Sequence, residues 1–283
     1  MQETTFNLAI QADGHVQFPN SNEWLTQLYN EASLKKIDQS QFNHLISKQI
    51  SFQNLEKNIF YTFKNKNFLI HALAQSTFCY EMNFAPHSSN EKLEFVGDSL
   101  VNLLVGKKIF HLFSDASEGE LSKLRGALVN EEKLAELARS IKLGEYLFLG
   151  KGEYKSGGFE KDSILADTFE ALIASIYFDN NEDLKECERV LEKIITQYEE
   201  SQKTIFYSLM HLDLFDPKSA LQELSMTHHG ILPSYESVEL PGQGGFLVTI
   251  KLGNKILGEL SGSSKKKVEK ALARMMIEKK RYL

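Results

Sequence analysis

Two apolar helical segments that contain acidic residues constrain this chain more than any other feature of its sequence. In the first, residues 90–113, Glu91, Glu94 and Asp98 stand three and four positions apart, so a helix places their carboxylates on one face. Few basic residues lie near enough in the sequence to pair with these acids, and clustered carboxylates repel one another unless a cation compensates them. The same segment has an apolar stripe at helical spacing, formed by Leu93, Val96, Leu100 and Leu103.

The second segment, residues 164–178, is apolar on almost every side, which is typical of a buried core helix. Asp167 and Glu170 lie inside it, one helical turn apart. Acidic side chains are almost never fully buried unless they are paired or hold a metal ion. Together the two segments predict one all-oxygen site for a hard divalent cation such as Mg²⁺.

The sequence EKLEFVGDSL in the first segment resembles the signature of the ribonuclease III family, and LADTFEAL in the second resembles that family's other acidic motif. The resemblance extends from about residue 55 to the C-terminus. It implies an all-α ribonuclease III endonuclease domain followed by a small α-β-β-β-α double-stranded-RNA-binding domain. It also implies a metal-dependent endoribonuclease that cleaves double-stranded RNA, leaves 5′-phosphate and 3′-hydroxyl ends, and processes rRNA precursors and other RNAs.

The resemblance assigns roles to the residues that match its motifs. Glu94, Asp167 and Glu170 are expected to coordinate Mg²⁺, for which Mn²⁺ is the alternative ion. Asp98 completes the site as a ligand or through a bound water, and Asp98 and Glu170 are the expected catalytic residues. Glu118 matches a further acid near a second metal ion, although the helix dipole alone also favours an acid at a helix N-terminus.

Four parts of the chain differ in their expected roles. For the N-terminal part we favour a helical extension that packs on the body. The alternative is an arm that docks a partner or RNA, but this part has no basic cluster. It contains two amphipathic stripes, one at residues 24–29 and one formed by Phe42, Leu45 and Ile46. The expected parts are an N-terminal extension of unknown role (residues 1–53), the catalytic domain (54–200), a linker (201–215) and the double-stranded-RNA-binding domain (216–283).

Charge is divided unevenly along the chain, whose net charge is −6. Residues 216–283 contain 11 basic and 7 acidic residues, a net charge of +4, which leaves −10 for the first 215 residues. A basic C-terminal domain beside an acidic body fits an RNA-binding module attached to a metal-binding one.

The final helix begins with GSSKKK, which places Lys265, Lys266 and Lys267 in its first turn. Lysines are unfavourable at a helix N-terminus unless an anion binds there, so their position predicts a phosphate site. The resemblance adds Lys270 and Gln222 as RNA-binding residues. Such a domain recognises the shape and 2′-hydroxyls of duplex RNA and does not depend on its sequence.

Some stretches depart from the family pattern. Glu269 stands where many such RNA-binding domains have a lysine. The loop expected between the first two strands, PGQGG at residues 241–245, lacks a histidine that is often found there. Family members also carry Thr-His-Arg-Ser after the first core helix. In its place stand Ala74, Gln75, Ser76 and Thr77.

One copy of each acidic motif provides one site, which cuts one strand, so cleavage of both strands implies a homodimer with a two-fold axis. In this family a phenylalanine at the position of Phe95 inserts into the partner subunit. Judged from the sequence alone, Phe95 fits an ordinary core position equally well.

The remaining features indicate a cytoplasmic protein without a membrane partner. No segment approaches the ~20 apolar residues of a membrane span, and the N-terminus has no apolar signal region. Cys79 and Cys187 match no metal-ligand spacing, which favours reduced thiols.

Two alternatives belong to other functional classes. One is a catalytically inactive, structural double-stranded-RNA-binding protein, but an inactive copy has no reason to keep Glu94, Asp98, Asp167 and Glu170 together. The other is a metal-stabilised binder of a different phosphorylated ligand, which the basic C-terminal domain makes less favourable.

Overall fold

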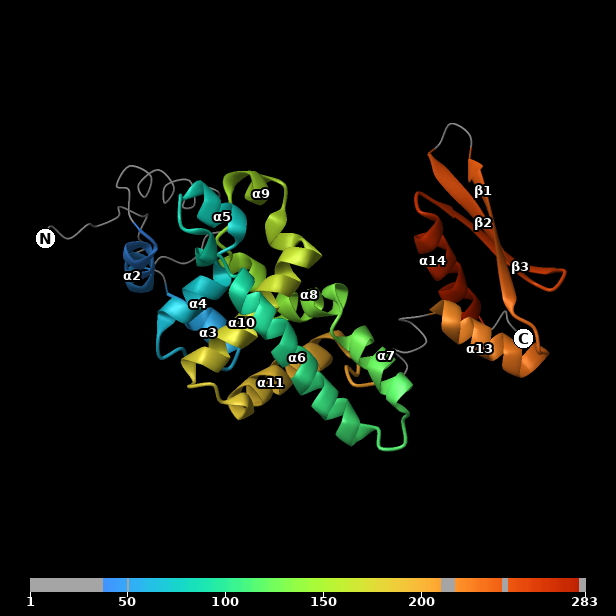
Figure 1. Cartoon of the computed structure of the whole chain (residues 1–283), viewed down its shortest axis with the longest axis horizontal. Coiled ribbons are helices and arrows are strands. Elements are labelled where there is room, and N and C mark those ends of the chain that lie inside the picture. Colours follow the sequence, from blue (N-terminus) through green and yellow to red (C-terminus); the bar gives the residue numbers. More distant parts are fainter. Residues whose placement is uncertain (1–37, 50, 210–216, 241–243, 280–283) are drawn as a thin grey trace, which may run out of the picture. The chain divides into compact units, whose positions relative to one another are not determined.

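The computed structural model describes residues 38–49, 51–209, 217–240 and 244–279 (Figure 1). The expected stripe at residues 24–29 lies outside them. The described residues form two compact units. The first unit consists of the described residues up to Leu112 and of Leu128–Phe206. The second consists of Phe113–Ala127 and of the described residues from Tyr207 onward.

The first unit is built from helices. Its α-helices are α2 (Gln39–Gln49), α3 (Gln53–Asn58), α4 (Lys66–Leu73), α5 (Ser76–Glu81), α6 (Glu91–Leu112), α8 (Glu131–Ser140), α9 (Lys151–Lys155), α10 (Asp162–Asp179) and α11 (Leu184–Gln202). Three short 3₁₀ turns complete it: η1 (Pro86–Ser88), η2 (Leu143–Tyr146) and η3 (Gly158–Glu160). None of the described helices has both the length and the apolar character that crossing a bilayer requires.

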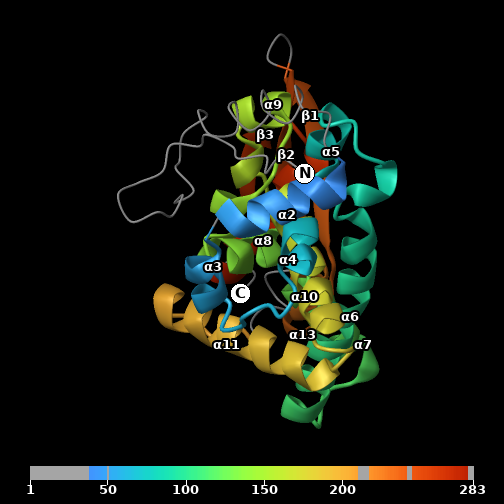
Figure 2. The same cartoon turned by 90° about the vertical axis from the view of Figure 1, so that its left-hand side faces the viewer.

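Helix α10 is the centre of this unit. It packs against α4, α6, α8 and α11, and most of its residues are buried (Figures 1 and 2). Its closest neighbour is α6, which approaches at Gly97: a Cβ atom added there would lie 1.9 Å from the carbonyl oxygen of Glu170. Only glycine permits this approach, which brings the two acidic motifs side by side.

Helix α2 packs on the body through the second stripe of the extension. Phe42 and Ile46 are buried. The centre of the Phe42 ring lies 5.3 to 5.6 Å from the ring centres of Phe78, Phe84 and Phe148. In Figure 2, α2 crosses over α4. The described part of the extension is therefore a core element of the first unit.

The stretch that departs from Thr-His-Arg-Ser forms its own contacts. Ala74 and Phe148 form an isolated parallel bridge, and the side chain of Gln75 accepts a hydrogen bond from the backbone N–H of Thr77 at the start of α5. The hydroxyl of Thr77 then accepts a hydrogen bond from the backbone of Gly150 at 3.0 Å. These residues therefore join α5 to the segment before α9.

The second unit contains α7 (Glu118–Leu128), α13 (Pro217–His229), β1 (Pro233–Leu240), β2 (Gly245–Leu252), β3 (Lys255–Gly262) and α14 (Lys265–Glu278). The strands form an antiparallel sheet in the order β1-β2-β3, and α13 and α14 pack together. The expected α-β-β-β-α order is confirmed. Its core consists of Leu221, Val248, Ile250, Leu252, Leu257, Val268, Leu272, Ala273 and Met276.

Gly97→Ala should separate α6 from α10. The added methyl group meets backbone, which cannot rotate away, so we expect a loss of about 2–3 kcal/mol in the free energy of unfolding, or roughly 4–12 °C in Tm. Gly119→Ala in α7 is the matched control, because nothing lies within 4 Å of an added Cβ there. Thermal melts of both variants test this. A Gly97→Ala protein as stable as wild type would contradict the packing described.

Candidate metal centre

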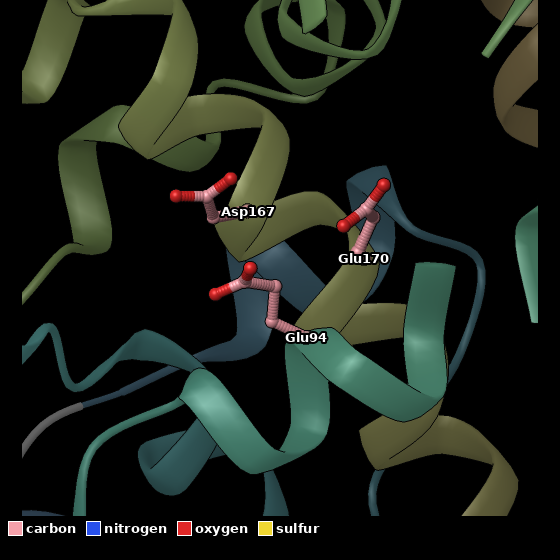
Figure 3. A group of neighbouring side chains, drawn as sticks. All are labelled: Glu94, Asp167 and Glu170. Carbon is pink, nitrogen blue, oxygen red and sulfur yellow. The ribbon is translucent and has the colours of Figure 1, made fainter. Parts of the chain in front are cut away.

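Three carboxylates from two helices form the candidate site. Glu94 is on α6, and Asp167 and Glu170 are on α10. One oxygen from each carboxylate lies within 4.8 Å of the other two (Figure 3). The structure therefore brings together the three residues that the sequence predicts as metal ligands.

The start of α6 is held by hydrogen bonds to the last turn of α4 and to the residue that follows it. The backbone N–H of Asn90 donates to the carbonyl oxygen of Ala74 at 2.8 Å, and its side-chain amide donates to the carbonyl oxygen of Ala72 at 3.2 Å. That amide also lies 3.5 Å from the hydroxyl of Thr168 on α10. Since Glu94 is one turn after Asn90, this network fixes where its carboxylate stands relative to α10.

Burial and repulsion from neighbouring acids raise the pKa values of the three carboxylates. Burial, followed by the charges of Asp98, Asp167 and Glu94, raises the pKa of Glu170 from 4.5 to about 8. Burial is also the main cause of the raised pKa of Glu94, with repulsion from Asp167 next. The pKa of Asp167 is raised by burial and then by the charge of Glu131. Bringing these groups together thus disfavours their ionised forms.

No basic side chain relieves this repulsion in the part of the chain that the structure describes, where none of the three carboxylates forms an ion pair. A divalent cation would supply the missing charge. Carboxylate oxygens are the ligands that hard cations such as Mg²⁺ and Mn²⁺ prefer, so the donor set fits such an ion.

Asp98 lies at the edge of the site. It is exposed, and its carboxylate accepts a hydrogen bond of 2.8 Å from the side-chain amide of Asn102. It is not among the three acids whose oxygens lie within 4.8 Å of one another, but its charge contributes to the raised pKa values of Glu94 and Glu170. Its catalytic role stays a prediction.

Two other acids stand at the starts of helices. Glu118 begins α7, which belongs largely to the second unit, and its part in a second metal site stays a prediction. Glu131, at the start of α8, raises the pKa of Asp167, a role that its sequence position did not predict. Its only signal is its place in the first turn of a helix, where acids are common for the helix dipole alone.

The predicted RNA-binding lysines are exposed at one end of α14. Lys265, Lys266 and Lys267 form its first turn, and Ser264 occupies the N-cap position without a side-chain capping bond. Lys270 is exposed one turn further on, and Gln222 on α13 is partly buried. Their contacts with RNA stay predictions.

Glu269, which stands where many such domains have a lysine, points into the domain. Its side chain is largely buried and forms an ion pair of 2.7 Å with Lys218 on α13. The ammonium group of Lys218 also lies 4.6 Å from the centre of the Tyr235 ring. Glu269 therefore joins the two helices of the domain.

Phe95 is not a core residue of this chain, since 77% of its surface is exposed. Leu103 and Phe110 lie on the same side of α6 and are 54% and 64% exposed. These three residues form an apolar stripe on the helix that also carries Glu94.

Metal-free protein should lose stability as the pH rises. The pKa of Glu170 is about 8 in the folded protein and 4.5 ordinarily, so the folded state binds more protons between these values. The free energy of unfolding in EDTA should therefore fall from about pH 4.5 to about pH 8, and Mg²⁺ or Glu170→Gln should reduce that fall. Tm measured against pH tests this. Parallel curves for all three samples would contradict it.

Comparisons with known proteins agree with this architecture. A Ribonuclease-III-like family model matches residues 65–198, and a double-stranded RNA binding motif matches residues 217–280. A Ribonuclease 3 from Histophilus somni is 38% identical over 236 residues, covering 81% of this chain and 98% of the relative. One from Pseudomonas syringae is 43% identical over 195 residues, covering 69% and 78%.

A solved nuclease domain of ribonuclease III from Campylobacter jejuni is 38% identical, covers 52% of this chain and 98% of that domain, and superposes with a TM-score of 0.48. The extent and identity of the curated relatives, together with the two matched domains, are sufficient to assign the family. This chain belongs to the ribonuclease III family, with one nuclease domain and one C-terminal double-stranded-RNA-binding domain.

Proposed function

We propose that this chain is an endoribonuclease that cleaves double-stranded RNA by metal-assisted hydrolysis of phosphodiesters. The observation that carries the proposal is the group of three carboxylates on α6 and α10, in a chain that also has a double-stranded-RNA-binding domain. The relatives named Ribonuclease 3 support it. No observation on the described residues favours an inactive structural protein.

Glu94, Asp167 and Glu170 would hold Mg²⁺, with Mn²⁺ as the alternative ion. When bound, the ion lowers the pKa of a water molecule and stabilises charge on the phosphate oxygens during hydrolysis. Glu170 must lose its proton to act as a ligand, so binding of the ion releases protons near neutral pH. Asp98, oriented by Asn102, would bind a water at the exposed edge of the site. The products are RNA with 5′-phosphate and 3′-hydroxyl ends.

The second unit would hold the duplex. Lys265, Lys266 and Lys267 meet at the N-terminus of α14, where free backbone N–H groups and ammonium groups together favour a phosphate. Such contacts do not depend on sequence, which suits long duplexes such as those in rRNA precursors.

The active form would be a homodimer. A single chain supplies one group of acids and cuts one strand, whereas two chains related by a two-fold axis cut both. The exposed stripe of Phe95, Leu103 and Phe110 offers a surface for this contact, since apolar groups at that density are costly to leave in water.

Glu170→Gln should bind duplex RNA but cut it at least about a hundredfold more slowly, because one group that stabilises the transition state is lost. Glu200→Gln, an exposed acid on α11, is the matched control and should cut normally. The assay is cleavage of a long labelled duplex in Mg²⁺, with binding measured separately. Wild-type protein that binds duplex and never cuts it, in Mg²⁺ or Mn²⁺, would refute the proposed activity.

Phe95→Glu should weaken the dimer by at least about 30-fold, the loss expected for a central apolar contact. The chain should stay folded, because this side chain is exposed. Tyr80→Glu on α5 is the matched control, with 83% of Tyr80 exposed. Sedimentation equilibrium measures the dissociation constants. Equal constants for the two variants would rule out the stripe as the interface.

A further inference from the structure

A pocket of about 270 Å³, lined mainly by residues with polar side chains, lies between α2 and the first turns of α4. Helix α2 precedes the match to the nuclease family model, which begins at residue 65. The pocket is large beside the ~30 Å³ that one water occupies, and small beside the ~300–1,000 Å³ of sites for drug-sized ligands. It therefore has room for a small organic group.

One wall of the pocket is the polar face of α2. Gln39, Ser40 and Asn43 share this face, because residues one and four positions after Gln39 lie on the same side of a helix as Gln39. The adjoining face is anchored by buried Phe42 and Ile46. Gln39 is fixed further, since its amide donates a hydrogen bond of 3.0 Å to the carbonyl oxygen of Ser88. The wall is thus held in place by the core.

The other wall is the face of α4 that carries Asn67, Phe68 and His71. Phe68 is half-buried, and its ring packs on no other aromatic ring among the described residues. The imidazole of His71 is tied to the carbonyl oxygen of Ser89 at 2.9 Å, and burial lowers its pKa, so it is uncharged at neutral pH. This wall offers one aromatic face beside neutral polar groups.

Two amides in the pocket are open to a ligand. The side-chain amides of Asn43 and Asn67 form no hydrogen bond to any other residue that the structure describes. Each offers a donor and an acceptor side by side, the arrangement with which asparagine recognises the edge of a nucleobase. An aromatic ring provides the stacking surface that such a base requires.

The pocket does not suit an anion. No Lys, Arg, Asp or Glu lines it. Asp38 accepts a hydrogen bond from the N–H of Gln41 at the start of α2, and Asn65 accepts one from the N–H of Asn67 at the start of α4. A negative side chain thus stands at one helix N-terminus, and backbone donors at both are already used. The preferred ligand is neutral, flat and polar at its edge.

We propose that this pocket binds a neutral nucleobase, either from an unpaired nucleotide of bound RNA or from a free nucleoside. The RNA source rests on the proposed function, whereas binding of a free nucleoside does not. Residues from α2 would in this way add a base-binding site to a nuclease domain whose substrate is otherwise held by its phosphates.

The test uses full-length protein and the four ribonucleosides, with binding followed by saturation-transfer NMR of the base protons. Wild type should show saturable binding of at least one nucleoside. Phe68→Leu should weaken it about tenfold, the scale for loss of one base–aromatic stack. Asn43→Ala, which leaves the aromatic wall intact, should also weaken it. Asn54→Ala on α3 is the matched control and should bind as wild type does.

Three results would overturn the proposal: no saturable binding of any nucleoside, equal binding of ribose or glutamine, or binding that both pocket variants leave unchanged. Melting curves show whether each variant is folded.

A second measurement separates the two sources of the base, bound RNA and free nucleoside. A hairpin RNA with an unpaired 3′ tail should bind more tightly than its blunt form, and Phe68→Leu should remove the difference. A tail without effect, beside nucleoside binding, assigns the site to free nucleosides.

The two proposals fail separately. Cleavage of a blunt duplex should be the same in wild type, Phe68→Leu and Asn43→Ala, because the pocket side chains are not among the acids of the metal centre. Nucleoside binding can be measured in EDTA, where no cleavage occurs. Absence of cleavage therefore leaves the pocket testable, and absence of nucleoside binding leaves the metal centre intact.

Discussion

The close approach of α6 to α10 is the interaction on which the rest of this structure depends. The two helices meet at Gly97, where the backbone of Glu170 occupies the place of a side chain. This contact brings Glu94 beside Asp167 and Glu170. Burial raises the pKa values of all three carboxylates, and repulsion within the group raises those of Glu94 and Glu170 further. The packing of this buried helix pair therefore holds three acidic groups together despite the cost of burying them and of their repulsion. A bound cation would neutralise their charge and remove that repulsion.

The same division of labour extends over the chain. The nuclease unit concentrates negative charge where a cation is needed, and the basic residues of the C-terminal domain gather at the start of α14. An acidic site alone would repel RNA, whose backbone carries one negative charge per phosphate. A separate basic domain overcomes this repulsion. Its lysines release counterions when they contact phosphates, and this supplies binding free energy that the metal centre need not provide.

Much of this could be predicted from the sequence, because helical spacing is a local property. The positions of Glu94, Asp167 and Glu170 within apolar segments predict a shared face, and the period-two segments after residue 233 predict a three-stranded sheet. What the sequence could not provide depends on contacts between distant segments. Glu269 pairs with Lys218, 51 positions away, and Phe95 is exposed although Leu93, two positions before it, is buried. The pocket between α2 and α4 likewise requires two segments that no short-range pattern connects.

The measurement that tests the central claim most directly is the anomalous scattering of Mn²⁺ in crystals of the protein. A single strong peak should appear within about 2.0–2.6 Å of oxygens from Glu94, Asp167 and Glu170, as carboxylate ligation of a hard cation requires. Such a peak would show that the packing of α6 on α10 builds a metal centre. A fully occupied Mn²⁺ site elsewhere, with these three carboxylates protonated or paired to basic side chains, would contradict the account.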